Sequence, residues 1–132
     1  MTQKKHQIRL SGDPYFQECL RKALGMLCRL ELSHKGQFTE AASIALMLIP
    51  ASEIVAEFQK GCCPPNAPHA KAPDPQSIDI TGEAAGHLAR LRGEVILLGE
   101  TRLNLRGIVH NAICALASKN DAEILERISI IQ

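Results

Sequence analysis

The sequence predicts a mostly α-helical fold that contains one two-stranded antiparallel ribbon. Three observations lead to this prediction. A short segment that alternates polar and apolar residues occurs twice, at residues 7–11 and 77–81. Each copy precedes stretches whose apolar residues recur at helical spacing. A segment at residues 61–76, which holds five of the seven prolines, separates the two copies. The order is therefore strand and helices, linker, strand and helices.

The two expected strands are short and amphipathic. In residues 7–11, Ile8 and Leu10 fall on one face and the other three residues on the opposite, polar face. A single strand of this length is not stable, because its backbone groups lack partners. Residues 77–81 repeat the alternation with two isoleucines. We therefore expect the two segments to pair with each other.

Three helices are expected after each strand. In the first half they span residues 14–31 after the cap residue Asp13, the stretch from the cap residue Thr39 to Pro50, and residues 52–60. In the second half a helix ends at Gly99, and Asn104 and Asp121 begin the next two. Apolar positions of the two first helices match at an offset of 68, and the caps of the two second helices at an offset of 65.

The predicted organisation is a single domain of residues 1–132. A first repeat covers residues 7–60, a linker residues 61–76 and a second repeat residues 77–131. The prolines exclude a helix or a central strand from the linker. At about 3.1 Å per residue in an extended form, roughly 15 residues reach about 45 Å. That length is sufficient to bring the second strand beside the first.

Composition narrows the class of protein. Five cysteines without framework spacing indicate a reducing cytoplasm. We find no signal peptide, and the longest apolar run is far too short to span a membrane. The net charge is +1, but residues 1–35 hold seven Lys or Arg against three acidic residues, which is compatible with one positive face.

The chemistry-bearing side chains do not suggest an enzyme. We find no phosphate-binding glycine loop and no catalytic arrangement, and we expect no cofactor. Cys62, Cys63 and His69 lack zinc-site spacing, so no metal is expected either. The three remaining cysteines, Cys19, Cys28 and Cys114, are predicted to lie in the core. His87 and His110 are predicted to lie on helix surfaces.

One short strand followed by two helices resembles the ribbon-helix-helix family of bacterial DNA-binding proteins. In that fold two copies pair their strands over a shared helical core. The run Asn104–His110, Asn-Leu-Arg-Gly-Ile-Val-His, is similar to the Asn-Leu-x-x-Ile-Ala-Arg run of plasmid mobilisation accessory proteins of the MobC type. Arg106 and Gly107 depart from the usual Asn and Gln there. Two copies in one chain resemble conjugation accessory proteins of the TraY type and the C-terminal domain of the VirC-operon enhancer of T-DNA transfer.

The resemblance implies a function. It implies a single-chain pseudodimer that binds double-stranded DNA in the bacterial cytoplasm and assists plasmid or T-DNA processing, conjugation and virulence. Relaxosome or other DNA-transfer proteins are the implied partners, and two molecules pairing side by side on DNA is an open alternative. A transcriptional repressor or an antitoxin with the same fold is a second hypothesis. A helical protein–protein adaptor without DNA binding is a third.

A two-stranded ribbon fits the major groove, where side chains read base edges. The expected base contacts come from the polar faces of both strands: Gln7, Arg9, Ser11, Ser77, Asp79 and Thr81. The expected phosphate contacts come from the basic arm and from the starts of the second helices: Lys4, Lys5, Ser33, Lys35, Thr39, Arg102, Asn104 and Arg106. Asp79 would be repelled by phosphate, so we expect it to pair with Arg9 across the ribbon.

Overall fold

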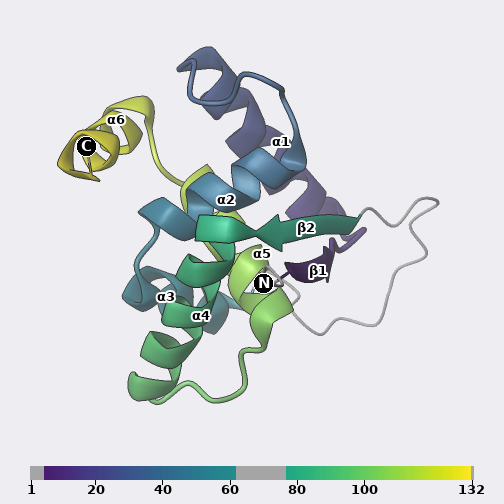
Figure 1. Ribbon diagram of the computed structural model, residues 1–132, viewed down its shortest axis with the longest axis vertical. Helices are drawn as coiled ribbons and strands as arrows, with labels where there is room; N and C mark the ends of the chain where they lie inside the picture. The colour runs from purple at the N-terminus through teal and green to yellow at the C-terminus, as the bar shows by residue number, and fades with distance from the viewer. Residues whose placement is uncertain (1–4, 62–76, 132) are drawn as a thin grey trace.

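The computed structural model describes residues 5–61 and 77–131. Those residues form a two-stranded sheet and six helices (Figure 1). The elements, in chain order, are β1 (Lys5–Arg9), α1 (Pro14–Arg29), α2 (Phe38–Leu48), α3 (Ala51–Lys60), β2 (Ser77–Thr81), α4 (Gly82–Leu97), α5 (Leu105–Ala117) and α6 (Asp121–Ile131). The prediction of a mostly helical chain with one small sheet is confirmed.

The two strands pair with each other although they lie far apart in the sequence. They run antiparallel, with Lys5 opposite Thr81 and Arg9 opposite Ser77. The isoleucines of both strands are buried on the inner face, against the helices. The predicted ribbon is therefore confirmed. Its first strand, however, begins and ends two residues earlier than the expected range of 7–11.

Ser11 is the reason for this shift. Its backbone N–H donates to Nε2 of His110 at 2.9 Å, and its carbonyl accepts from Nε2 of Gln17 at 2.6 Å. Its hydroxyl accepts from the backbone N–H of Asp13 at 3.1 Å. These bonds hold Ser11 in the turn before α1, where it is buried. The expectation that Ser11 extends the strand was wrong.

Helices α1 and α5 each begin directly after a residue whose side chain caps the helix. Asp13 caps α1 by accepting from the N–H of Phe16 at 3.3 Å, and Asn104 caps α5 by accepting from the N–H of Gly107 at 2.7 Å. Both caps were predicted. The second helix, in contrast, begins at Phe38 with Gln37 as its N-cap, so the prediction of Thr39 as the cap was wrong.

Helix α5 forms the centre of the core. Every residue from Gly107 to Ala117 is buried, and α1, α2 and α3 of the first half all pack against this helix. Helix α2 in turn packs against α4 of the second half. Figure 1 shows α5 enclosed between helices of the first half and the ribbon. The two halves thus share one apolar core and do not form separate ones.

Helix α6 is attached more loosely than α3, the last helix of the first half. Ile124 is its only fully buried side chain, and among the described elements α6 packs mainly against α2. Two ion pairs hold it: Nη2 of Arg127 lies 2.8 Å from Oε2 of Glu53, and Nη2 of Arg29 lies 2.5 Å from Oδ1 of Asp121. Figure 1 shows α6 at the edge of the molecule.

The predicted core cysteines differ from one another in burial. Cys114 is buried in α5 and Cys19 is half-buried in α1, but Cys28 is exposed near the end of α1. The prediction for Cys28 was therefore wrong. Burial is also the main cause that raises the pKa of the Cys19 thiol to about 11, so this thiol stays protonated at neutral pH.

Candidate nucleic-acid interface

The outer face of the ribbon carries six exposed polar side chains. Five of them are predicted base-contacting residues and the sixth is Lys5. The exposed set is Lys5, Gln7, Arg9, Ser77, Asp79 and Thr81. Ser11 is absent from this set, because its hydrogen bonds keep it in the buried turn. The face therefore combines donors and acceptors of the kind that recognise base edges.

Asp79 lies opposite Gln7 in the ribbon, not opposite Arg9. Its Oδ2 is 3.4 Å from Nζ of Lys5, and both side chains are about half exposed, at 60% for Lys5 and 49% for Asp79. The expected pair with Arg9 was wrong, because the register places Ser77 opposite Arg9. Such an exposed pair adds little stability. It does place a positive charge beside the one carboxylate on this face.

Arg106 joins the ribbon to α5. Its Nε–H donates to the backbone carbonyl of Arg9 at 2.7 Å. This bond fixes the end of β1 against the first turn of α5 and leaves the Arg9 side chain exposed on the outer face. Arg106 was predicted only as a phosphate contact. The structure shows that it also positions a predicted base-contacting residue.

His110 lies beneath this junction and is fully buried. Its ring centroid is 4.3 Å from that of Phe16. Nε2 must accept from the N–H of Ser11, so the proton lies on Nδ1, which donates to the carbonyl of Arg106 at 2.7 Å. Burial lowers the pKa of His110 to about 4. The prediction of a surface histidine was wrong, and its position among the apolar residues of α5 was the signal for burial.

A groove of about 470 Å³ lies beside the ribbon, between β1, α4 and the start of α5. Its basic lining residues are Lys5, His6, Arg92 and Arg106, and Gln7, Ile8, Asn104 and Leu105 complete the lining. None of the described residues in this lining is acidic. His6 belongs to the basic arm that was considered from the sequence as a phosphate contact, whereas Arg92 was missed as part of a site. Arg92 follows the core residue Leu88 by one helical turn, which places it beside the apolar face of α4.

Arg102 is engaged within the protein. Its guanidinium binds Glu100 with Nε–Oε1 at 3.0 Å and Nη2–Oε2 at 3.1 Å, and it lies 5.3 Å from the centre of the Phe58 ring. Hydrogen bonds from Arg102 lower the pKa of the buried Glu100 carboxyl. The negative charge of Glu100 partly offsets the positive charge that Arg102 would present to a phosphate.

At the start of α2 an acidic side chain binds some of the groups that were predicted to contact phosphate. The Glu40 carboxylate accepts from the hydroxyl of Ser33 at 3.0 Å and from the backbone N–H groups of Lys35 and Gln37 at 3.1 and 3.4 Å. Ser33 is buried and Thr39 is half-buried, whereas the Lys35 side chain is exposed. Desolvation raises the pKa of Glu40, but these hydrogen bonds outweigh it and the net shift is downward.

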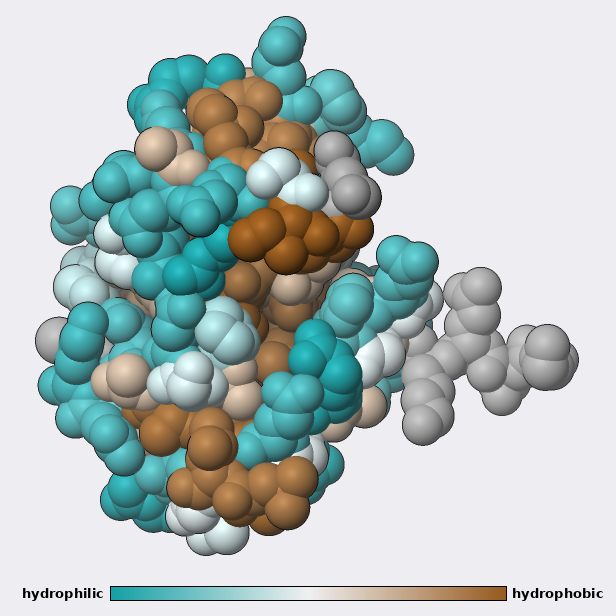
Figure 2. All heavy atoms as spheres, turned by 90° about the vertical axis from the view of Figure 1, so that its left-hand side faces the viewer, coloured by the Kyte–Doolittle hydropathy of each residue, from teal (hydrophilic) through white to brown (hydrophobic). Residues whose placement is uncertain are grey.

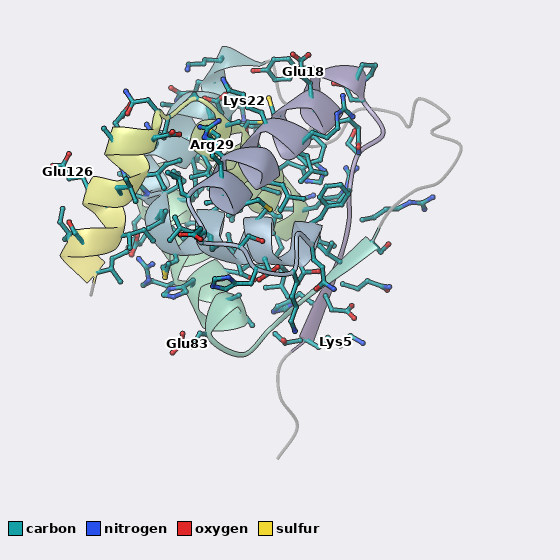
Figure 3. All side chains as sticks on the ribbon, turned by 90° about the horizontal axis from the view of Figure 1, so that it is seen from above. Lys5, Glu18, Lys22, Arg29, Glu83 and Glu126 are labelled. Carbon is teal, nitrogen blue, oxygen red and sulfur yellow. The ribbon has the colours of Figure 1, made fainter. Side chains whose placement is uncertain are left out.

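Figure 3 shows Lys5 on the ribbon, on a different side of the molecule from Glu126 of α6. Lys4, also predicted to contact phosphate, lies outside the described residues, as do Cys62, Cys63 and His69. Within residues 5–61 and 77–131, no group of three His, Cys, Asp or Glu side chains is placed to hold a metal ion.

In the same part of the chain, no single helix is both long enough and apolar enough to cross a membrane. Helices α2 and α3 meet those criteria only when they are taken together, across a bend of 112°. Both helices contribute buried residues to the core. Comparison of the chain with protein-family models, curated proteins and solved structures gives no match.

Proposed function

We propose that this protein binds double-stranded DNA by placing its ribbon in the major groove, as an accessory factor in plasmid or T-DNA processing and transfer. The observation that carries the proposal is the two-faced ribbon. Its inner isoleucines are buried against the helical core, and its outer face presents a row of exposed polar side chains. A two-stranded ribbon has the dimensions that the major groove admits.

The outer face has chemistry suited to base edges. Gln7 fits the donor and acceptor of adenine, Arg9 fits the two acceptors of guanine, and Asp79 can accept from the amino group of cytosine. Lys5, which lies 3.4 Å from Asp79, offsets the repulsion between this carboxylate and phosphate. The predicted base-contacting set is thus retained without Ser11.

The packing between halves supports the proposed pair of ribbon-helix-helix repeats. The first helix of each half packs against the second helix of the other, α1 on α5 and α4 on α2, and the second helices pack on each other. A pseudo-twofold axis would relate such contacts. Because the two halves differ in sequence, we propose that the ribbon reads an asymmetric site as a monomer in the cytoplasm.

The test is binding to duplex DNA at increasing salt. We expect affinity to fall steeply with salt as phosphate contacts are lost. Arg9→Ala should reduce discrimination among duplexes selected from a random pool, by about 1–3 kcal/mol at its base position. The matched control is Arg90→Ala, since Arg90 pairs with Glu94 and lines a groove next to α6. Absence of duplex binding at low salt would refute the proposal.

A repressor or antitoxin with the same ribbon remains the closest alternative. It would bind promoter duplexes in preference to transfer-origin or border duplexes, so a panel of all three separates the two roles.

The adaptor hypothesis is favoured by one observation, the exposed apolar side chains at the end of α4 and along α6. These are Ile96, Leu97, Leu98, Leu125, Ile130 and Ile131. Figure 2 shows apolar surface over α6 above and over the end of α4 below. A protein with this role alone would not bind duplex DNA at any salt concentration. If the protein binds DNA, the same surface is available to DNA-transfer proteins.

A further inference from the structure

We propose that the protein binds DNA backbone phosphates on one side of the ribbon only. The binding site is the groove beside β1 whose basic lining residues are Lys5, His6, Arg92 and Arg106. This inference rests on the proposed DNA binding. It departs from the expectation, drawn from the repeat, that the starts of both second helices, α2 and α5, hold a phosphate.

The charge of the groove supports a backbone contact. Lys5 and His6 come from β1, Arg92 from α4 and Arg106 from α5, so three elements direct basic groups to one space. Arg92 is exposed and forms no ion pair with the acidic residues that the structure describes. None of the described residues that line the groove is acidic, and although Lys5 also pairs with Asp79 on the outer face, Arg92 and Arg106 add positive charge, so a phosphate there meets attraction from several sides.

The groove also lies directly beside the proposed reading face. Lys5 and Gln7 belong to both, since they line the groove and are exposed on β1. Phosphates border the major groove, so a ribbon that reads base edges must pass close to the backbone on each side. The groove is placed to receive the backbone on the side of β1.

The corresponding end of α2 is closed by the protein's own carboxylate. Glu40 accepts hydrogen bonds from Ser33, Lys35 and Gln37, the donors that a phosphate would otherwise use. At α5 the capping side chain is the neutral amide of Asn104. A phosphate at α2 would therefore meet the negative charge of Glu40, whereas among the described residues no carboxylate caps α5.

One-sided contact has a consequence for orientation. A symmetric dimer binds a site equally well in either direction. This protein would bind the backbone on one flank of the site through four basic groups. On the other flank Glu40 occupies the donors at the start of α2, so phosphate is bound less well there. The protein should therefore bind a site in one direction only. The strongest phosphate contacts should then lie on one flank of the site.

The experiment measures the salt dependence of duplex binding for the full chain and three variants. Arg92→Ala should weaken binding severalfold on all duplexes and lower the slope of log affinity against log salt by about one. Arg90→Ala, two residues away in α4, is the matched control and should keep the slope of the original protein. Lys35→Ala tests the α2 end and should also keep it.

The outcomes separate the two proposals. Equal losses for Lys35→Ala and Arg92→Ala would show contact at both ends and overturn the inference. An Arg92→Ala variant that matches Arg90→Ala, with duplex binding intact, would overturn it as well and leave the proposed function standing. If the original protein binds no duplex at low salt, both proposals fail. Phosphate-ethylation interference should place the inhibiting phosphates on one flank, and inhibition on both flanks would contradict the inference.

Discussion

At the scale of single residues, three hydrogen bonds connect the end of β1 to the start of α5. The N–H of Ser11 donates to His110, Nδ1–H of His110 donates to the carbonyl of Arg106, and Nε–H of Arg106 donates to the carbonyl of Arg9. The chain of bonds requires a neutral imidazole with its proton on Nδ1. A second proton on His110 would remove the acceptor for Ser11 and place a charge in the core.

We therefore predict that stability falls as the pH falls below about 6.5. The pKa of His110 is about 4 in the folded protein and about 6.5 when unfolded, so the unfolded chain binds the additional proton first. The contribution is fully present above pH 6.5 and is lost progressively towards pH 4. At about 1.36 kcal/mol per pKa unit, the loss is on the order of 3 kcal/mol. Urea unfolding at a series of pH values measures it.

Two variants assign this effect to His110. His110→Gln should be less stable than the original protein at pH 7 and should have a flatter stability curve between pH 4 and pH 6.5. His87→Gln is the control, since His87 is only half-buried on α4, and it should retain the original curve. An unchanged curve in His110→Gln would show that the carboxylates cause the acid sensitivity.

At the scale of elements, the sequence predicted which elements exist better than where they begin. Asp13 and Asn104 were recognisable as caps because their side chains act within three residues. The end of β1 was not predictable in that way, because it depends on a hydrogen bond between Ser11 and His110, which are 99 positions apart. The same long-range bond explains why one predicted base contact proved to be buried.

The start of α2 was misjudged for a different reason. Thr39 is a favoured capping residue, and the sequence alone gave no reason to pass over it. The Glu40 carboxylate instead reaches back to the N–H groups of Gln37 and Lys35, and this moves the start of the helix to Phe38. The carboxylate also changes the candidate site, since it occupies donors that were assigned to phosphate.

Helix α6 provides the prediction at this scale. Arg127 binds the carbonyl of Leu48 at 3.2 Å and Glu53 at 2.8 Å, and Lys119 reaches the other oxygen of Glu53 at 2.6 Å. Because α6 buries little apolar surface, we expect Arg127→Ala to release it. Amide hydrogen exchange in α6 should accelerate at least tenfold, while exchange in α5 should change far less.

Arg29→Ala is the matched control for this prediction. Arg29 also forms an ion pair with this part of the chain, at Asp121, but its side chain is 63% exposed and that of Asp121 is 43% exposed. Figure 3 shows Arg29 at the end of α1 near α6. Solvent screens such a pair, so its loss should change exchange little. Equal acceleration in both variants would show that α6 is held by its charges in general and not by the contact at Glu53.

At the scale of the whole molecule, the fold depends on both halves. The ribbon takes one strand from each, and α5 is buried by three helices of the other half. The segments that build this core lie far apart in the sequence. The core can therefore form only after the long stretch of chain between the two halves has brought them together. Residues 5–61 alone would expose the inner sides of α1, α2 and α3 to water, with Phe16, Leu27 and Ile54 among the side chains left without partners.

We predict that residues 1–61 and residues 77–132, produced separately, are each largely unfolded, and that mixing them restores the fold as a one-to-one complex. Each fragment lacks the partner strand and most of the surface that covers its helices. Circular dichroism should show low helicity for each fragment and a gain in helicity on mixing, and sedimentation should give the mass of one copy of each. A first fragment that unfolds cooperatively by itself would mean that residues 1–61 form an independent domain. The packing of α1, α2 and α3 against α5 would then be a contact between two independently folded units. The ribbon would in that case not be required for folding.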